Sequence, residues 1–291
     1  MNTKADIPPW DTGLWNEIRQ AVLAEFQRIN IGMRFLPQRK AGEDARTVPA
    51  DLIESKSGKL FIEEAPTTPL IETWAEFALS PQQLSGEPKY QTAKTLAVRA
   101  ANFLAQAKDA LIFQGEKALS TNPTFTEKRV FARSGPAGVG LLDAAQPAGQ
   151  LEVAALDSAS SSFGDNTFSA IAEGYSRLQG LGHHGPYAVV LHSLPYADAF
   201  APIPSLLRPA ERIETLLQGG LYGTATLPPG TGFLVSTGGS SLEVLVGREP
   251  AAAFLQEDPD GSYRFRVWQR FALRIRDPSA IIGLRFRTGA G

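Results

Sequence analysis

The segment 263–276 constrains the fold more than any other part of the chain, because apolar and basic residues alternate along it with a period of two. One face carries Tyr263, Phe265, Val267, Phe271, Leu273 and Ile275. The other face carries Arg264, Arg266, Trp268, Arg270, Arg274 and Arg276. Successive side chains of a β-strand point to opposite faces, so the pattern predicts one long strand with a single face in a hydrophobic core.

The row of arginines on this strand needs acidic partners. From residue 263 onward the chain has seven arginines and one acid, Asp277, whereas the whole chain has 28 Lys and Arg against 30 Asp and Glu. A basic face of this kind can bind nucleic acid or an acidic partner, or it can form salt bridges between strands or subunits. The near-neutral total favours salt bridges. We therefore predict an inter-subunit charge ladder of Arg264, Arg266, Arg270, Arg274 and Arg276.

The composition is that of a globular chain. Its 291 residues are 43% hydrophobic and 20% charged, which is enough for a sizeable core without disulfides or metals. The absence of cysteine excludes thiolate nucleophiles and Cys-containing zinc sites. No apolar run approaches the length of a membrane span, and the first residues have no apolar signal core, which favours the cytoplasm.

The remaining pattern mixes helices and strands. Amphipathic helices are predicted at 14–29, 91–112, 167–181 and 209–218. Strands are predicted at 70–79, 187–192 and 280–286, and near Leu221, Phe233 and Leu242, whereas 116–149 has the composition of a loop. Residues 51–54 and 59–63 flank a turn and predict a hairpin with too little apolar content for its own core. Without a regular βαβ repeat, the fold class is α+β.

Motifs for catalysis or cofactor binding are weak. The glycine-rich run 134–140 lacks the Lys-Ser/Thr ending of a phosphate loop and is interpreted as a turn. His183 and His184 are adjacent without a nearby acid, and His192 ends a strand, so neither arrangement predicts a metal site. The serine clusters at 160–162 and 240–241 lack the setting of a nucleophile elbow. We predict no catalytic residue, no metal and no cofactor.

Several short motifs, taken in order, resemble those of one protein family. They are Trp15-Asn16-Glu17-Ile18, Gly32-Met33-Arg34-Phe35, the run 110–115 that ends the second helix, Gly138-Val139-Gly140, Gly185-Pro186-Tyr187, Arg212-Ile213-Glu214, Leu245-Val246-Gly247-Arg248-Glu249 and Phe271-Ala272-Leu273-Arg274-Ile275. Their order and spacing resemble the linocin-type encapsulin shell proteins, which share the tailed-phage major-capsid fold. No single motif is specific, but together they cover nearly the whole chain.

The resemblance implies an architecture with a peripheral domain, an axial domain and an extended arm. Residues 1–40 would form the N-terminal helix and the start of the peripheral domain, and 41–85 the arm. Residues 86–141 would complete the peripheral domain with its spine helix, 142–247 would form the axial domain, and 248–291 would return to the peripheral domain. An arm of this kind is ordered through contact with neighbouring subunits.

The resemblance also implies a function. The chain would be the subunit of a closed icosahedral homo-oligomer, a cytoplasmic nanocompartment that encloses a cargo enzyme with a C-terminal targeting peptide, for example a ferritin-like protein or a peroxidase. Candidate peptide-docking residues are Trp15, Ile18, Val22 and Phe26, which could instead only pack the helix onto its own domain. A fivefold pore loop is expected at Ala201, Pro202, Ile203, Pro204 and Ser205.

This chain also departs from the family, and other functions stay open. Met33 separates Gly32 from Arg34, residues 117–133 look inserted, and Pro81-Gln82-Gln83 stands where some members have a flavin-binding tryptophan. Flavin binding is therefore not predicted. The main alternative is a phage major capsid protein that packages DNA, although the first helix starts without a scaffolding segment before it. A hydrolase would need a nucleophile and a base within reach of each other.

Overall fold

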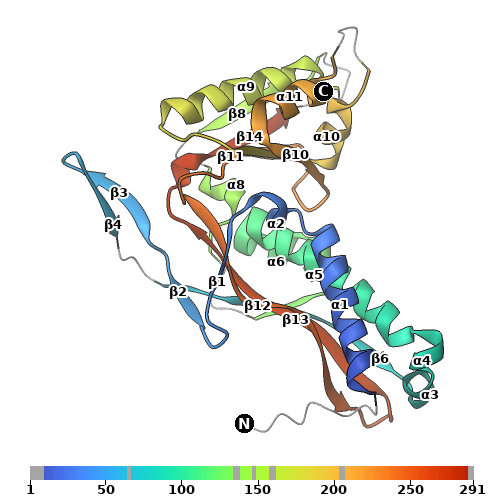
Figure 1. Ribbon diagram of the computed structural model, residues 1–291. Helices are drawn as coiled ribbons and strands as arrows, with labels where there is room; N and C mark the ends of the chain where they lie inside the picture. Colours follow the sequence, from blue (N-terminus) through green and yellow to red (C-terminus); the bar gives the residue numbers. More distant parts are fainter. Residues whose placement is uncertain are drawn as a thin grey trace.

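Two five-stranded sheets organise the chain, and a hairpin arm projects from between them (Figure 1). The computed structural model describes residues 10–63, 67–133, 138–145, 149–156, 162–202 and 207–287. The first sheet has the order β1 (Gln38–Lys40), β12 (Leu242–Glu257), β13 (Tyr263–Ile275), β6 (Ile71–Leu79) and β7 (Phe131–Arg133). Its central strand is the arginine-rich segment, as its alternating pattern predicts.

The strand β13 pairs antiparallel with β12 on one side and with β6 on the other. Phe265, Val267 and Phe271 are at most 1% exposed and belong to the larger hydrophobic core. Gln269 occupies the same buried face and donates from Nε2 to the carbonyl oxygen of Leu104. The period of two therefore places one face of this strand in the core, as predicted.

Two long helices cover this core face, α1 (Thr12–Ile29) and α5 (Thr92–Gln114). They lie side by side along the sheet (Figure 1). Asp11 caps α1 by accepting a hydrogen bond from the backbone N–H of Leu14 at 2.7 Å. Ala97, Ala101 and Ala105 of α5 are fully buried, because small side chains let the helix approach its neighbours closely. Short helices flank α5 and α1: α2 (Gly32–Phe35), α3 (Pro81–Ser85) and α4 (Glu87–Tyr90).

The second sheet has its own core. Its order is β10 (Gln218–Thr224), β9 (Tyr187–His192), β11 (Thr231–Ser236), β14 (Ile281–Arg287) and β8 (Gln150–Ala154). The helices α9 (Asp165–Gly180), α10 (Ser193–Ala199) and α11 (Pro209–Leu217) pack against it. Ile171, Leu191, Leu234 and Ile282 are fully buried in this second core. The fold class is therefore α+β, with two sheet-based units, as predicted.

The predicted return of residues 248–291 to the first unit is wrong for β14. This strand pairs with β11 and β8 in the second sheet. Residues 281–284 are all buried, so β14 needs cover on both faces. In the second sheet Ile281 joins the first core and Ile282 joins the second core, and α9 contacts the strand. The expected boundary at 247 also falls inside β12, a strand of the first sheet. The other domain boundaries stay predictions.

The segment 116–149, expected to be a loop, contains single turns of helix and one short strand in its described part: η1 (Gly115–Lys117), α6 (Ala118–Thr121), α7 (Pro123–Thr126), β7 and α8 (Leu141–Ala144). Gly138 and Gly140 press against the end of α5. A Cβ on Gly140 would overlap the backbone nitrogen of Gly115, which itself has φ of +61°. The glycines thus permit close backbone packing; residues 134–137 of the run lie outside the described residues.

The arm is built from two short antiparallel pairs. β2 (Thr47–Pro49) pairs with β5 (Thr67–Pro69) at its base, and β3 (Leu52–Lys56) pairs with β4 (Lys59–Glu63) in the projecting hairpin (Figure 1). Ser57 and Gly58 connect β3 and β4 with φ of 53° and 73°. A two-residue turn with both φ values positive matches the twist of a hairpin, so the predicted hairpin is confirmed.

Candidate assembly and docking surfaces

The arm exposes three consecutive large apolar side chains on β4. Leu60, Phe61 and Ile62 are 78%, 49% and 61% exposed. Because side chains alternate along a strand, Leu60 and Ile62 lie on one face of the hairpin and Phe61 on the other. Neither face is covered by another part of the described chain. Contiguous exposed apolar surface of this kind marks an interaction site.

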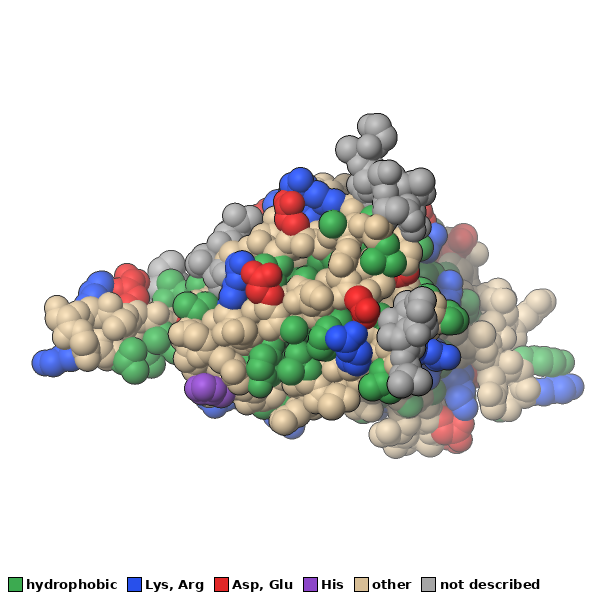
Figure 2. All heavy atoms as spheres, turned by 90° about the horizontal axis from the view of Figure 1, so that it is seen from above, with side chains coloured by type: hydrophobic (Ala, Val, Ile, Leu, Met, Phe, Trp, Pro, Cys, Tyr) green, Lys and Arg blue, Asp and Glu red, His purple; other side chains and the backbone are tan. Residues whose placement is uncertain are grey.

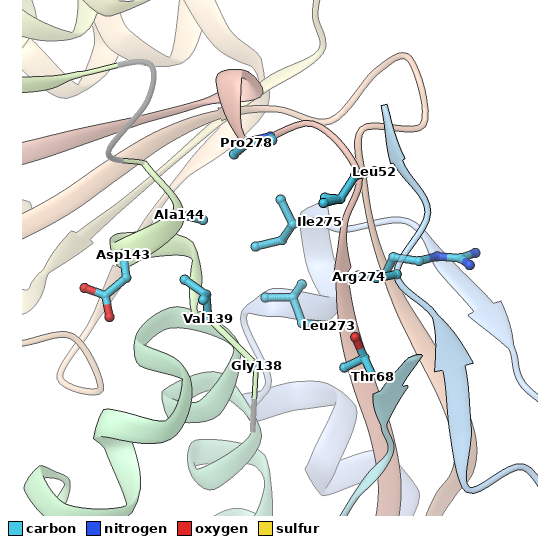
Figure 3. Close-up of a pocket in the computed structure, with 11 residues that line it drawn as sticks. Leu52, Thr68, Gly138, Val139, Asp143, Ala144, Leu273, Arg274, Ile275 and Pro278 are labelled. Atoms are coloured by element: carbon cyan, nitrogen blue, oxygen red, sulfur yellow. The ribbon is translucent and has the colours of Figure 1, made fainter. Parts of the chain in front are cut away.

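A cavity of about 380 Å³ lies at the base of the arm, beside the strand β13 of the first sheet (Figure 3). Leu52 of β3 lines one side, Val139 lines another, and Leu273, Ile275 and Pro278 complete the apolar wall. Leu273 and Ile275 point into the cavity, whereas the side chain of Arg274 between them points away (Figure 3). The alternation of β13 thus gives this cavity an apolar lining and places the arginine on the opposite face.

The arginines of β13 find most of their acidic partners within the same chain. The ion pairs are Arg264 with Asp258 and Glu76, Arg266 with Glu72, and both Arg274 and Arg276 with Glu243 and Asp51. For these four arginines the expected inter-subunit ladder is corrected to an intramolecular one, because neighbouring strands and the arm base place acids opposite them. Glu243 and Arg274 are 5% and 8% exposed, so the innermost pair is largely shielded from solvent.

Arg270 differs from the other four. It lies opposite Glu72 in the register of β13 and β6, but no ion pair forms between them. Its Nε is buried and makes no hydrogen bond with any described residue. An acid on another subunit stays a prediction for this arginine alone.

The four predicted cargo-docking residues of α1 are buried in the chain's own core. Trp15, Ile18, Val22 and Phe26 are 5%, 1%, 0% and 0% exposed. They pack against the first sheet and α5, so none is available to a peptide without opening the core. This corrects the docking assignment in favour of the alternative reading. An apolar stripe at helical spacing indicates burial but does not identify what buries it.

A groove of about 330 Å³ runs along another face of α1. Leu23 of α1 and the residues 246–251 of β12 line it, with Arg19, Lys40 and Glu43 at its edges. β1 pairs with β12 only as far as Val246, and the register of β12 against β13 shifts on both sides of Arg248. Gly247 and Pro250 fall in this irregular stretch, so β12 leaves an unpaired edge beside α1. An unpaired edge offers backbone N–H and C=O groups to an extended peptide.

The expected pore loop is described only in part. Ala201 and Pro202 follow α10, and the backbone N–H of Ala201 donates to the carbonyl oxygen of Asp198 at 2.9 Å. The carboxylate of Asp198 accepts hydrogen bonds from the backbone N–H groups of Phe163 and Gly164, which anchors the start of this loop. Ile203, Pro204 and Ser205 lie outside the described residues, so their pore role stays a prediction.

On the face above the second sheet, acidic and basic side chains lie next to each other in pairs (Figure 2). Arg177 pairs with Glu173 of the same helix at 2.5 Å, and Arg212 of α11 pairs with Asp165 of α9 at 2.7 Å. Such exposed pairs contribute little stability. Their mixed charge gives this face no general attraction for nucleic acid.

One serine–histidine contact could not be predicted from the sequence, because the two residues are 96 positions apart. His183 Nε2 lies 2.7 Å from the hydroxyl oxygen of Ser279, and that hydroxyl lies 2.5 Å from Oδ1 of Asp277. In a catalytic triad the carboxylate binds the other ring nitrogen and leaves the serine to the histidine. Here Asp277 engages the serine directly and caps η2 (Pro278–Ala280), which is a structural role.

Other titratable groups offer little support for catalysis. The Nδ1 atom of His192 accepts the backbone N–H of Leu194, and burial lowers the pKa of this histidine. In the part of the chain that the structure describes, no three His, Asp or Glu side chains lie together in a way that could hold a metal. No helix in the same part is both long and apolar enough to cross a membrane.

Known proteins resemble the chain in both sequence and fold. The family model described as encapsulating protein for peroxidase matches residues 139–272. The type 1 encapsulin shell protein EncA of Myxococcus xanthus is 28% identical over 293 residues, covering 95% of this chain and 93% of that protein. The chain is similar to the linocin-type encapsulin shell proteins. The resemblance indicated by the sequence motifs is thereby confirmed.

Solved structures show which known fold the chain has. A virus-like particle from Pyrococcus furiosus matches with a TM-score of 0.64 and 18% identity, covering 93% of this chain and 99% of that chain. The capsid of Myoviridae phage XM1 matches with a TM-score of 0.59 and 15% identity, covering 89% and 92%. The fold is the one that encapsulins share with tailed-phage capsid proteins. Relatives of this kind are structural shell proteins, and the phage alternative has less support than the encapsulin one.

Proposed function

We propose that this chain is the subunit of a self-assembling, closed cytoplasmic compartment that encloses a cargo enzyme. The observation that carries the proposal is the arm, whose apolar residues Leu60, Phe61 and Ile62 are left exposed by the part of the chain that the structure describes. A monomer gains nothing from such an arm, whereas a closed assembly buries it repeatedly. The similarity to EncA and to encapsulating proteins for peroxidase supports the same function.

Microscopy of the purified full chain tests the shell function. Negative staining is expected to give closed particles of uniform size, and the ratio of absorbance at the nucleic-acid and protein maxima is expected to be that of protein alone. Particles filled with DNA would favour the phage capsid instead. A monodisperse monomer or dimer at micromolar concentration would contradict the proposal.

Cargo capture is proposed for the groove between α1 and the unpaired edge of β12. A peptide in extended conformation could add to β12 near Arg248 through backbone hydrogen bonds. Its Leu or Ile side chains would contact Leu23 and Pro250, which are among the apolar residues that line the groove. The groove lies on the N-terminal helix, as expected from the resemblance, but on a different face from the predicted residues.

Substitution of Leu23→Arg is expected to reduce cargo loading at least about tenfold, since burial of one Leu contributes about 1.5–3 kcal/mol. The probe is a fluorescent protein with a C-terminal tail bearing Leu and Ile, co-expressed with the full chain. Fluorescence per purified particle measures loading. Ala24→Arg is the matched control, because it adds the same charge to the same helix outside the groove. Equal loading of the Leu23→Arg particles and the wild type would exclude this groove.

A further inference from the structure

A separate pocket of about 230 Å³ lies between β6, α5 and the inserted segment. Phe77 of β6, Phe103 of α5 and Phe131 of β7 supply aromatic walls. Phe131 is 39% exposed and stacks on Trp74 with 5.7 Å between ring centroids. The inserted segment thus closes a pocket that β6 and α5 alone would leave open. Aromatic walls with a few convergent polar groups are typical of small-molecule sites.

Three basic side chains surround these rings. The guanidinium groups of Arg99 and Arg129 lie over the same Phe103 ring, 4.4 and 5.4 Å from its centroid. Lys128 is the third cation that lines the pocket. The pocket therefore combines an aromatic wall with concentrated positive charge, which an anion would offset.

The acids near the pocket leave a positive excess. Glu127 pairs with Arg129. Glu76 itself lines the pocket, but it is engaged by Arg264 and by the indole N–H of Trp74. Among the described residues, Arg99 and Lys128 form no ion pair. The charge of Arg99 contributes to lowering the pKa of Glu25, but the carboxylate of Glu25 already accepts hydrogen bonds from Arg28 and Asn102. Two cations in this pocket therefore lack an acidic partner in direct contact.

The turn that carries Lys128 is preformed. Lys128 has φ of 55°, a left-handed conformation that is unfavourable for a residue with a side chain. Its backbone N–H donates to the carbonyl oxygen of Phe125, and the N–H groups of Arg129 and Val130 both donate to that of Thr124. These hydrogen bonds fix the backbone that carries the lysine and its neighbouring arginine, so the turn itself does not have to be ordered when a ligand binds.

We propose that this pocket binds a small organic anion in which an aromatic ring carries a carboxylate or phosphate group. The ring contacts Phe77, Phe103 and Phe131, and the anionic group is held by Arg99 and Lys128. Guanidinium groups suit both carboxylate and phosphate because their N–H groups form paired hydrogen bonds with two oxygens. The volume of the pocket is sufficient for a compound of one or two rings. The proposal does not depend on the shell function.

Calorimetric titration of the full chain with benzoate and phenyl phosphate tests this site, with benzamide and phenol as the neutral counterparts. At least one anion is expected to bind at least tenfold more tightly than its neutral counterpart, and more weakly as salt is raised. Saturable binding of neither anion up to about 10 mM, or equal binding of the neutral compounds, would overturn the proposal.

Two variants locate the binding. Arg99→Gln and Lys128→Gly are each expected to weaken anion binding about tenfold or more, since each removes one charge-assisted hydrogen bond. Lys128→Gly retains the turn, because glycine adopts the positive φ freely. Arg177→Gln, an exposed arginine of α9, is the control and is expected to bind as the wild type does. Anion binding unchanged in both pocket variants would also overturn the proposal, and microscopy of the same samples separates this result from any failure of the shell function.

Discussion

Replacement of Leu60, Phe61 and Ile62 together by threonine is expected to leave a folded chain that no longer forms closed particles. Burial of one large apolar side chain contributes about 1.5–3 kcal/mol, and the three are removed from every subunit of the assembly. Threonine favours β-strands, so the hairpin can persist while its apolar surface is lost. Because these side chains are about half or more exposed and belong to none of the hydrophobic cores, the stability of the isolated subunit should change little.

Light scattering and negative staining measure the loss of particles, and circular dichroism measures the retained secondary structure. Lys59→Gln is the matched control in the same strand, since it alters a polar side chain of the hairpin and leaves its apolar surface intact. If the triple variant still forms particles of wild-type size at the same concentration, the arm does not supply the contacts that hold the shell. The proposed basis of assembly would then be wrong.

Long segments with a clear period could be predicted from the sequence. The alternation of β13 and the apolar spacing of α1 each extend over several turns or residue pairs, so many residues agree on one structure. The helix α5 and the arm hairpin follow from the same kind of signal. The pairing of β14 could not be predicted, because a short strand buried on both faces suits either sheet.

The candidate surfaces were less predictable than the elements that carry them. The apolar stripe of α1 is equally typical of a helix packed on its own core and of a peptide-binding helix. Only the structure shows that these side chains are buried in the core of the same chain. The acids that pair with Arg274 are Glu243 and Asp51, 31 and 223 positions away, so composition could not reveal them. The grooves arise from a register shift in β12 and from an inserted turn, neither of which has a periodic signal.

The second prediction with a large effect concerns a buried carboxylate that joins the spine helix to the N-terminal helix. Asp109 of α5 is 2% exposed. It accepts three hydrogen bonds where α1 ends and α2 begins: from Asn30 Nδ2 at 2.9 Å, from Ile31 N at 2.8 Å and from Gly32 N at 2.9 Å. The side chain therefore satisfies buried donors that have no water to replace it.

At pH 8, where the carboxyl group is charged, Asp109→Asn is expected to lower the free energy of unfolding by about 2–3 kcal/mol, because the amide nitrogen cannot accept the hydrogen bond it would face. A buried donor would be left without a partner, which costs more than the loss of an exposed contact. Chemical denaturation of the triple threonine variant, with and without Asp109→Asn, measures this free-energy difference in the absence of shell contacts. Asp143→Asn is the control, since its salt bridge with Lys117 is exposed and should change stability by less than about 0.5 kcal/mol.

The same carboxyl group gives this loss of stability a defined pH dependence. Burial raises the pKa of Asp109 to about 7, against the opposing effects of the Ile31 and Gly32 N–H groups and of the charges on Lys108 and Arg34. Burial lowers the pKa of Lys108 to about 8, so this neighbour keeps its proton over the range in which Asp109 titrates. From about pH 4 to pH 7 the folded chain holds a proton that the unfolded chain releases, so wild-type stability falls as pH rises. Asp109→Asn lacks this fall, and the stability difference between the two chains should therefore be largest near pH 4 and smallest above pH 7. A difference that stays constant from about pH 5 to pH 8 would show that the carboxylate is charged in the folded chain throughout, and that its three donors outweigh its burial.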